Sequence, residues 1–198
     1  MAERALRAVG ATGLFVLCVG AVGCMTTDGL AGGGEPSGAA TGSVTPKMVF
    51  VTSRVYGATL GGYSGADAAC KAAADASTLD GMHGKKWTAV LAGSSTTLGE
   101  AKWSMPSGDV VAATTAALIA GKLETELASD ENGNVTMYTD PRDVWTGGTI
   151  GAAPIADCAR WTSTNATAIV GHPIDTDTTW DLGPAPCASQ EHLYCAEL

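Results

Sequence analysis

The sequence predicts a loop-rich α+β domain that folds outside the cell and is held by two disulfide bonds. Three observations favour this class. Over residues 47–198, short runs rich in β-branched and aromatic residues are separated by stretches of Gly, Pro, Ser and Thr, as in short strands joined by loops. Charged residues make up only 16% of the chain and 26 residues are Gly, which argues against a bundle of long helices. The same region contains an even number of cysteines, which predicts disulfides in an exported protein.

The first 24 residues predict an export signal rather than part of the fold. Arg4 and Arg7 precede a short apolar run at 14–19, and small residues then lead to Cys24 in the sequence AVGC. This pattern resembles the lipobox of bacterial lipoproteins, in which cleavage leaves an acylated cysteine as the new N-terminus. We therefore expect a signal peptide at 1–23 and a lipid anchor on Cys24. An ordinary cleaved signal that leaves Cys24 free is the alternative.

Residues 24–46 predict a flexible tether between the anchor and the domain. After Cys24 the sequence reads MTTDGLAGGGEPSGAATGSVTP, with almost no large apolar side chain to bury. Such a composition does not offset the entropy lost on ordering the chain. The folded domain is therefore expected to begin at Lys47 and to extend over 47–198.

Local patterns in the domain predict four strands. The β-branched or aromatic runs lie at 47–52, 87–91, 144–146 and 191–196. A turn is expected at 130–133, and Gly147 and Gly148 are expected to turn the chain after the third run. Residues 152–186 are rich in Pro, Thr, Asp and Gly without a clear period. A loop of this length is expected to be functional or to be fixed by a disulfide.

Two short helices are predicted as well. Ser64 is placed to cap the first helix, with Asp67 bonding back to the cap. One face of this helix would carry Ala66, Ala69, Cys70 and Ala73, so Cys70 is expected to point inward. Asp109 is placed to cap a second helix over 110–120, which Gly121 would end.

The cysteines of the domain are expected to pair with one another, but their spacing does not say how. The four are Cys70, Cys158, Cys187 and Cys195. Four cysteines allow three connectivities. None of them belongs to a close C-x-x-C pair, so a zinc site is a poor alternative.

Five sequence elements occur in a fixed order along the domain. They are GGYSGADAAC at 61–70, Gly84 followed by WTAVL at 87–91, VWTG at 144–147, DCARWT at 157–162, and the Cys187–Cys195 pair followed by Ala196 and Glu197. In this order they resemble endostatin, the C-terminal domain of certain collagens. They resemble even more closely the endostatin-like surface lipoproteins of bacteria. The resemblance covers nearly all of residues 47–198.

The resemblance implies a C-type-lectin-like fold, with a mixed sheet, two short helices and two nested disulfides. It implies that Cys70 pairs with Cys195 and that Cys158 pairs with Cys187. The zinc site of animal endostatin does not carry over, because residues 45–52 contain no His. Heparin binding does not carry over either, because Arg54, Arg142 and Arg160 are the only arginines of the domain and the chain is acidic.

These features predict a binding module rather than an enzyme. We expect a lipid-anchored adhesion or recognition domain that binds an extracellular protein or a glycan. The sequence contains no nucleophile elbow, no H-E-x-x-H and no phosphate loop, so a cell-wall or glycan hydrolase is the less favoured alternative. A net charge of −9 argues against nucleic acid as a partner. Trp103 and Trp180 are candidate exposed anchors for a ligand, with core packing as the default expectation.

A calcium-dependent carbohydrate-binding protein is the main alternative. Asp175, Asp177 and Asp181 alternate in DTDTTWD, and alternating oxygen ligands suit Ca²⁺. The segment lacks the W-N-D element and the E-P-N or Q-P-D triplet of C-type lectins, so a solvated acidic loop is the other interpretation. Thermal unfolding with calcium and with a chelator separates the two. No metal site is predicted from the three histidines, which are far apart in the sequence.

Overall fold

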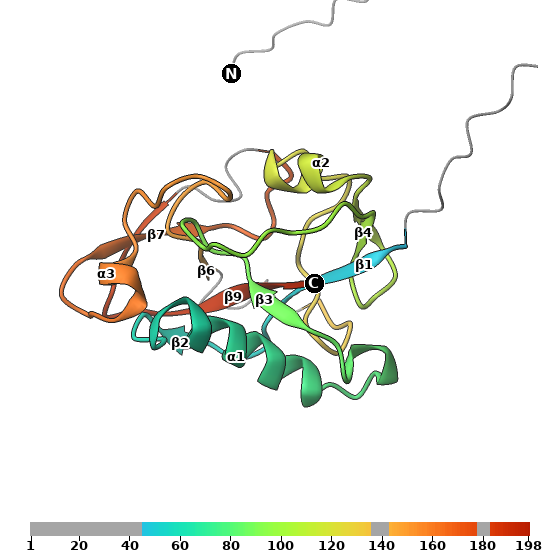
Figure 1. Cartoon of the computed structure of the whole chain (residues 1–198), viewed down its shortest axis with the longest axis horizontal. Coiled ribbons are helices and arrows are strands. Elements are labelled where there is room, and N and C mark those ends of the chain that lie inside the picture. The colour runs from blue at the N-terminus through green and yellow to red at the C-terminus, as the bar shows by residue number, and fades with distance from the viewer. Residues whose placement is uncertain (1–44, 136–142, 178–182) are drawn as a thin grey trace, which may run out of the picture. The chain divides into compact units, whose positions relative to one another are not determined.

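The strand β9 (Gln190–Glu197) lies at the centre of the sheet in the computed structural model of the chain, which describes residues 45–135, 143–177 and 183–198. It pairs antiparallel with β1 (Lys47–Val51), β2 (Tyr56–Gly57) and β3 (Trp87–Ala89), and parallel with β6 (Val144–Trp145). Figure 1 shows β9 running through the middle of the domain between β1 and β6. One strand thus organises most of the sheet.

The remaining strands extend the sheet on both sides of β9. Its order is β5-β4-β1-β9-β6-β7-β8, with β4 (Trp103–Ser104), β5 (Val110–Ala112), β7 (Thr167–Gly171) and β8 (Gly183–Pro186) outside the central strands. The pairs β1–β4 and β6–β9 are parallel, whereas the other pairs along this path are antiparallel. The described residues therefore form a loop-rich, mixed α+β fold, as the sequence predicts at this level of detail.

The sheet separates two apolar cores, because side chains alternate between the faces of a strand. On β1, Phe50 packs into the core beside α1 (Gly62–Asp75), while Val49 and Val51 pack into the core beside α2 (Thr115–Ile119). On β9, Cys195 faces the first core and Tyr194 faces the second. Because both faces are covered, every residue of β9 from Glu191 to Ala196 is buried.

Helix α1 confirms the predicted apolar face but not the predicted cap. Its buried residues are Ala66, Cys70, Ala73 and Ala74. The residue before the helix is Gly61 with φ of 82°, and no side chain caps the helix. The Asp67 carboxylate instead accepts hydrogen bonds from Ala89 N and Thr88 Oγ1, each at 2.8 Å. The capping roles predicted for Ser64 and Asp67 are therefore wrong, because the partner of Asp67 lies on β3.

The second predicted helix is correct only in its second half. Residues 110–112 form β5 and pair with β4, consistent with the strand preference of consecutive valines. The helix α2 begins after Thr114, whose side chain accepts a hydrogen bond from Ala117 N at 3.0 Å. Asp109 lies in the turn before β5 and accepts a hydrogen bond from Ser107 Oγ. Thr114, and not Asp109, is therefore the cap.

Residues 152–186, which lack a sequence period, contain more regular structure than predicted. Strands β7 and β8 form an antiparallel pair here, and α3 (Cys158–Trp161) gives the described residues a third helical segment where the sequence predicts two. All four residues of α3 have positive φ, from 52° to 64°, so this single turn is left-handed. No helix signal in the sequence predicts such a turn, because L-residues avoid this conformation. A 3-10 turn, η1 (Asp80–Met82), precedes β3.

Two disulfides join segments that are distant in the sequence. Cys70 on α1 is bonded to Cys195 on β9, and Cys158 on α3 is bonded to Cys187, which follows β8. This is the pairing that the resemblance to endostatin implies. Two disulfides fit a protein that is exported to an oxidising compartment. Among the described residues, no helix is long and apolar enough to span a membrane.

Candidate functional site

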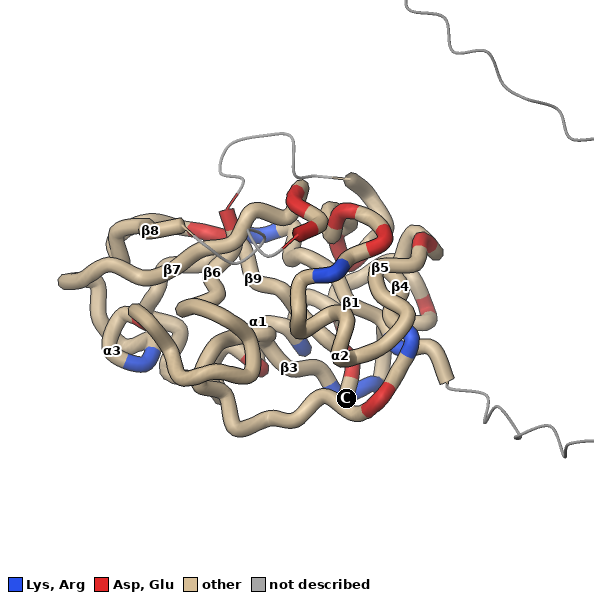
Figure 2. Tube along the Cα trace, turned by 90° about the horizontal axis from the view of Figure 1, so that it is seen from above, with Lys and Arg blue, Asp and Glu red and all other residues tan. Residues whose placement is uncertain are grey.

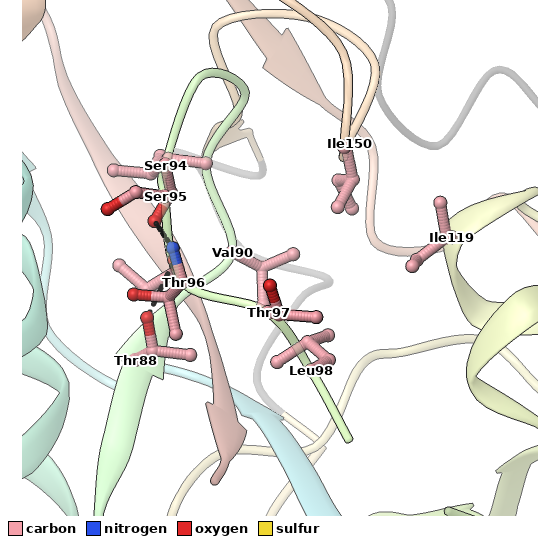
Figure 3. A pocket seen from close by; sticks show the side chains of 12 residues that line it. Thr88, Val90, Ser94, Ser95, Thr96, Thr97, Leu98, Ile119 and Ile150 are labelled. Carbon is pink, nitrogen blue, oxygen red and sulfur yellow. Dashed lines mark hydrogen bonds between the residues drawn. The ribbon is translucent and has the colours of Figure 1, made fainter. Parts of the chain in front are cut away.

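A cavity of about 300 Å³ lies beside β3. Three segments line it: β3 with the loop that follows it, the end of α2, and the loop after β6. In Figure 3, Ile119 and Ile150 lie across the open space from Val90, Thr97 and Leu98. The remaining wall carries Thr88, Ser94, Ser95 and Thr96. One side of the cavity is therefore rich in hydroxyl groups and the opposite side is aliphatic.

The loop after β3 is fixed to the loop after β6 by main-chain hydrogen bonds. Ala92 N donates to Thr146 O at 2.8 Å, and Gly93 N donates to Ala152 O at 2.9 Å. Gly93 has φ of 78°, and a Cβ at this position would lie 2.6 Å from Tyr63 Oη. Only glycine therefore fits the closest approach of the two loops. The two loops hold both walls of the cavity in place.

Tyr63 on α1 supports the same loop from behind. Its hydroxyl donates a hydrogen bond to Ala92 O at 3.0 Å. Burial raises the pKa of the Tyr63 hydroxyl above 10, and the negative charge of Asp157 raises it further, while Arg160 opposes the shift. The hydroxyl thus stays protonated, and remains a hydrogen-bond donor to the loop, throughout the neutral range.

The cavity has an uncharged lining. The residues that line it are Thr, Ser, Ala, Val, Leu, Ile and Gly, and none of them carries a charge or titrates near neutral pH. General acid–base catalysis needs a side chain that gains or loses a proton. The lining offers hydroxyl groups that donate and accept hydrogen bonds, together with aliphatic surface. These groups suit a neutral ligand.

A second cavity of similar volume has a different character. It is lined by charged residues at the outer side of α1 and β3, namely Asp67, Lys71, Lys85 and Lys86, together with Ala68, Trp87 and Leu198. Lys71 forms an ion pair with Asp75, and Lys85 forms one with Glu197 at 2.9 Å. Because carboxylates already neutralise two of these lysines, the uncharged cavity is the stronger candidate for a functional site.

The structure corrects the interpretation of Trp103 as an exposed anchor. Trp103 is 0% exposed and packs in the core beside α2. Its indole Nε1 donates to Thr115 Oγ1 at 3.0 Å, which ties β4 to α2. Pairing of β4 with β1 and β5 places this side chain inside, where it offers no contact to a ligand. Trp180, the other candidate, lies outside the described residues.

The acidic segment is only partly described. Asp175 is half-buried and Asp177 is exposed, whereas Asp181 lies outside the described residues. Leu123 N donates to Thr176 O at 3.1 Å, so the segment lies against the loop after α2. Within the described ranges, no three His, Cys, Asp or Glu side chains come together as a metal site would require. Calcium binding by this segment stays a prediction.

The three histidines occupy separate places, each with a hydrogen-bond partner. His83 Nε2 lies 2.8 Å from Ser77 O, and His192 Nδ1 lies 2.6 Å from Thr52 O. His172 Nδ1 lies 2.8 Å from Asp143 Oδ1. Each contact joins neighbouring segments of the fold, which is a structural role.

Asp and Glu outnumber Lys and Arg in the sequence of the domain. Figure 2 shows acidic residues gathered around β5 and on the side that carries β7 and β8. The net charge of the chain is −9. The neutral cavity therefore belongs to an acidic domain, which disfavours anionic ligands and nucleic acid.

Comparison with known proteins adds no relative. No protein-family model matches the chain, and a search of curated proteins finds no match. The proposed site therefore depends on its own geometry.

The sequence patterns did not single out the residues of the cavity. Between Gly93 and Gly99, the run SSTTL has the composition of a loop and carries no catalytic or metal-binding motif. The opposite wall comes from Ile119 and Ile150, which are distant in the sequence. The uncharged run between two glycines was the only local signal, and it does not by itself indicate a cavity. The anchor residue Cys24 lies outside the described residues.

Proposed function

We propose that the protein is an exported binding module, anchored to a membrane by a lipid on Cys24, that presents residues 47–198 to an extracellular protein or glycan. The two disulfides support export, since such bonds persist in oxidising compartments. The lipobox-like sequence before Cys24 supports the anchor. The tether composition at 25–46 would hold the domain away from the membrane surface.

The fold is proposed to be endostatin-like and of the C-type-lectin-like class. The sequence elements that carry the resemblance occupy structured positions. WTAVL begins in β3, VWTG covers β6 and its turn, and DCARWT forms the left-handed turn α3. The two cysteine pairs form the bridges that the resemblance implies. These positions support the assignment of the fold.

The uncharged cavity beside β3 is the observation that carries the binding function. Its volume, about 300 Å³, lies at the lower end of the range for ligand pockets. The cavity combines aliphatic surface with hydroxyl groups and has no titratable group for catalysis. A side chain or a sugar ring from a larger ligand fits these properties better than a substrate for acid–base chemistry does.

Blocking the cavity tests the proposal. Thr97 is exposed on its rim, so Thr97→Trp fills the opening without disturbing either core. We expect this variant of the full chain to lose binding to immobilised cell-surface and matrix extracts while its Tm stays close to that of the parent. Thr164→Trp is the matched control, because Thr164 is exposed in the loop before β7. If both variants bind equally well, the cavity is not the binding site.

The lipid anchor is tested separately. Cys24→Ala removes the thiol that would carry the acyl chain. We expect the parent protein to incorporate a labelled fatty acid and to fractionate with membranes, and the variant to do neither. Membrane fractionation of the variant equal to that of the parent would refute the anchor without affecting the binding site.

A further inference from the structure

One wall of the cavity is a strand-like segment that has no partner strand. Residues 94–99, between β3 and β4, alternate strictly between half-buried and exposed. Ser95 and Thr97 are exposed, whereas Thr96 and Leu98 are half-buried. An alternation of period two is typical of an extended chain with one face against the protein. The segment is therefore shaped like a strand but pairs with none of the described strands.

Several main-chain polar groups in the middle of this segment are free to bond to a partner. Within the part of the chain that the structure describes, the N–H and C=O groups of Ser95, Thr97 and Leu98 form no hydrogen bond. Three other groups of the segment are already bonded: Ser94 N donates to Leu91 O at 3.2 Å, Thr96 N donates to Ser94 Oγ at 3.2 Å, and Gly99 O accepts from Thr115 Oγ1 at 2.8 Å. N–H groups of alternate residues in an extended chain point to the same edge. The edge that carries Ser95 and Thr97 is therefore open as far as Gly99, whose C=O is already bonded to Thr115.

The ends of the main sheet do not offer such an edge. β8 carries Pro184 and Pro186, which have no N–H to donate. At the other end, Val111 O on β5 accepts a hydrogen bond from Glu124 N at 2.8 Å. Proline and covering loops protect terminal strands from pairing with another chain. The segment at 94–99 differs in that the unpaired donors and acceptors of Ser95, Thr97 and Leu98 border a cavity.

We propose that residues 94–99 bind an extended segment of a partner protein as an added strand. Main-chain hydrogen bonds to Ser95 and Thr97 would hold the segment, and one of its side chains would enter the cavity. That side chain is uncharged and aliphatic or small, because no charged residue lines the cavity and Ile119 and Ile150 form its far wall. The inference rests on the proposed binding function and names its partner as a peptide chain.

A protein segment fits this site better than a glycan. The free groups belong to the main chain of nearby residues, in the spacing that another extended peptide matches. No aromatic side chain lines the cavity, so the apolar face of a sugar ring has no aromatic ring to pack on. Small and aliphatic side chains are the groups that its dimensions and lining accommodate.

Proline substitutions distinguish the contribution of main-chain hydrogen bonds to binding from that of the side chains. The probes are short peptides selected from a random displayed library against the full chain. Ser95→Pro and Thr97→Pro each remove one N–H and are compatible with an extended backbone. Each should weaken peptide binding by about five- to tenfold, the effect of one lost hydrogen bond. Thr97→Val keeps the N–H and should bind about fivefold more tightly than Thr97→Pro. Thr164→Pro, in an exposed loop far along the chain, is the matched control and should bind like the parent.

Hydrogen exchange gives an independent measurement. In the free protein the amides of Ser95 and Thr97 should exchange rapidly, and saturating peptide should slow both. The inference is overturned if no peptide is selected, if the proline variants bind as tightly as the parent, or if these amides stay unprotected. Should a neutral oligosaccharide bind instead, weakened to the same extent by Thr97→Val and Thr97→Pro because both lose the hydroxyl, the peptide inference fails while the binding function stands. If the chain itself forms dimers and Thr97→Pro abolishes them, the segment binds a second copy of the chain, and the inference of a different partner protein is also overturned.

Discussion

Asp67 joins two elements that local sequence patterns treat separately. Its carboxylate accepts hydrogen bonds from the main chain of Ala89 and from the Thr88 hydroxyl, each at 2.8 Å. These contacts connect the middle of α1 to β3, the strand that leads into the cavity wall. A side chain that looks like a helix cap by spacing therefore fixes the position of the helix on the sheet.

Removing this carboxylate should destabilise the fold. We expect Asp67→Ala to lower the free energy of unfolding by about 2 kcal/mol, because two half-buried hydrogen bonds to a charged acceptor are lost. Urea unfolding monitored by tryptophan fluorescence measures the change. Asp75→Ala, on the same helix, is the control, since its exposed ion pair with Lys71 contributes less than about 1 kcal/mol. Equal losses in the two variants would contradict this role of Asp67.

Two tyrosines are expected to make the free energy of unfolding fall at alkaline pH. Burial raises the pKa of both Tyr56 and Tyr63 above 10, with additional contributions from Glu131 and Asp157 respectively. A raised pKa in the folded state means that folding favours the protonated hydroxyl. This contribution is complete below pH 10 and is lost as pH rises through the folded pKa values.

The pH dependence can be tested with Tyr56→Phe and Tyr63→Phe. Phenylalanine has no proton to lose, so the double variant should show a smaller fall in unfolding free energy above pH 10 than the parent. Urea unfolding on both sides of pH 10 measures the slope. Tyr63→Phe alone should also lower stability at neutral pH, because its hydrogen bond to Ala92 is lost. An unchanged alkaline slope in the double variant would contradict the shifts.

At the level of elements, the sequence predicted the central strands and missed those on either side. The runs at 47–52, 87–91, 144–146 and 191–196 correspond to β1, β3, β6 and β9, since strongly apolar or β-branched residues are buried on these strands. Strand β8 was missed because Gly and Pro dominate it, and β7 was missed because its short run of Ile169 and Val170 lies in a stretch rich in Thr, Gly and Pro. Pairing of β7 with β6 and with β8 decides their conformation. The cavity was missed because three distant segments build it.

The left-handed turn α3 is the clearest case of tertiary structure overriding local preference. Cys158, Ala159, Arg160 and Trp161 all have positive φ, which costs L-residues roughly 1–2 kcal/mol each. Three contacts hold the turn. The Asp157 side chain accepts a hydrogen bond from Arg160 N, Cys158 is bonded to Cys187, and the Trp161 ring packs edge-on against Trp145.

Glycine should relieve the turn. Ala159 is exposed and has φ of 54°, so Ala159→Gly removes the steric cost while leaving the bridge and the tryptophan in place. We expect an increase of about 1 kcal/mol in the free energy of unfolding. Ala153→Gly, at an exposed loop position without positive φ, should instead lower it by about 0.5 kcal/mol. Thermal unfolding of both variants measures the difference, and destabilisation by Ala159→Gly would show that the turn is not left-handed in solution.

For the whole molecule, stability depends on closing long loops around β9. Its partners β1, β2, β3 and β6 lie between 48 and 147 positions earlier in the chain by their paired registers, from Val144 with His192 to Val49 with Ala196. Such pairings cost loop entropy before they gain packing energy. The disulfide between Cys70 and Cys195 closes one of these loops covalently and joins α1 to the strand on which the sheet depends.

The two bridges should therefore differ in their contribution. The Cys70–Cys195 bridge spans 125 positions and the Cys158–Cys187 bridge spans 29, which in the chain-entropy model correspond to about 5 and about 3.5 kcal/mol. All four cysteines are buried, so paired replacement by alanine removes similar contacts in each case. Loss of the inner bridge, Cys158–Cys187, also lets the left-handed turn relax, which further reduces the net loss of unfolding free energy in that variant. Urea unfolding should thus show a larger loss of unfolding free energy for C70A/C195A, which lacks the outer bridge, than for C158A/C187A, which lacks the inner one. A larger loss for C158A/C187A would mean that the turn, rather than β9, is the weakest point of the fold.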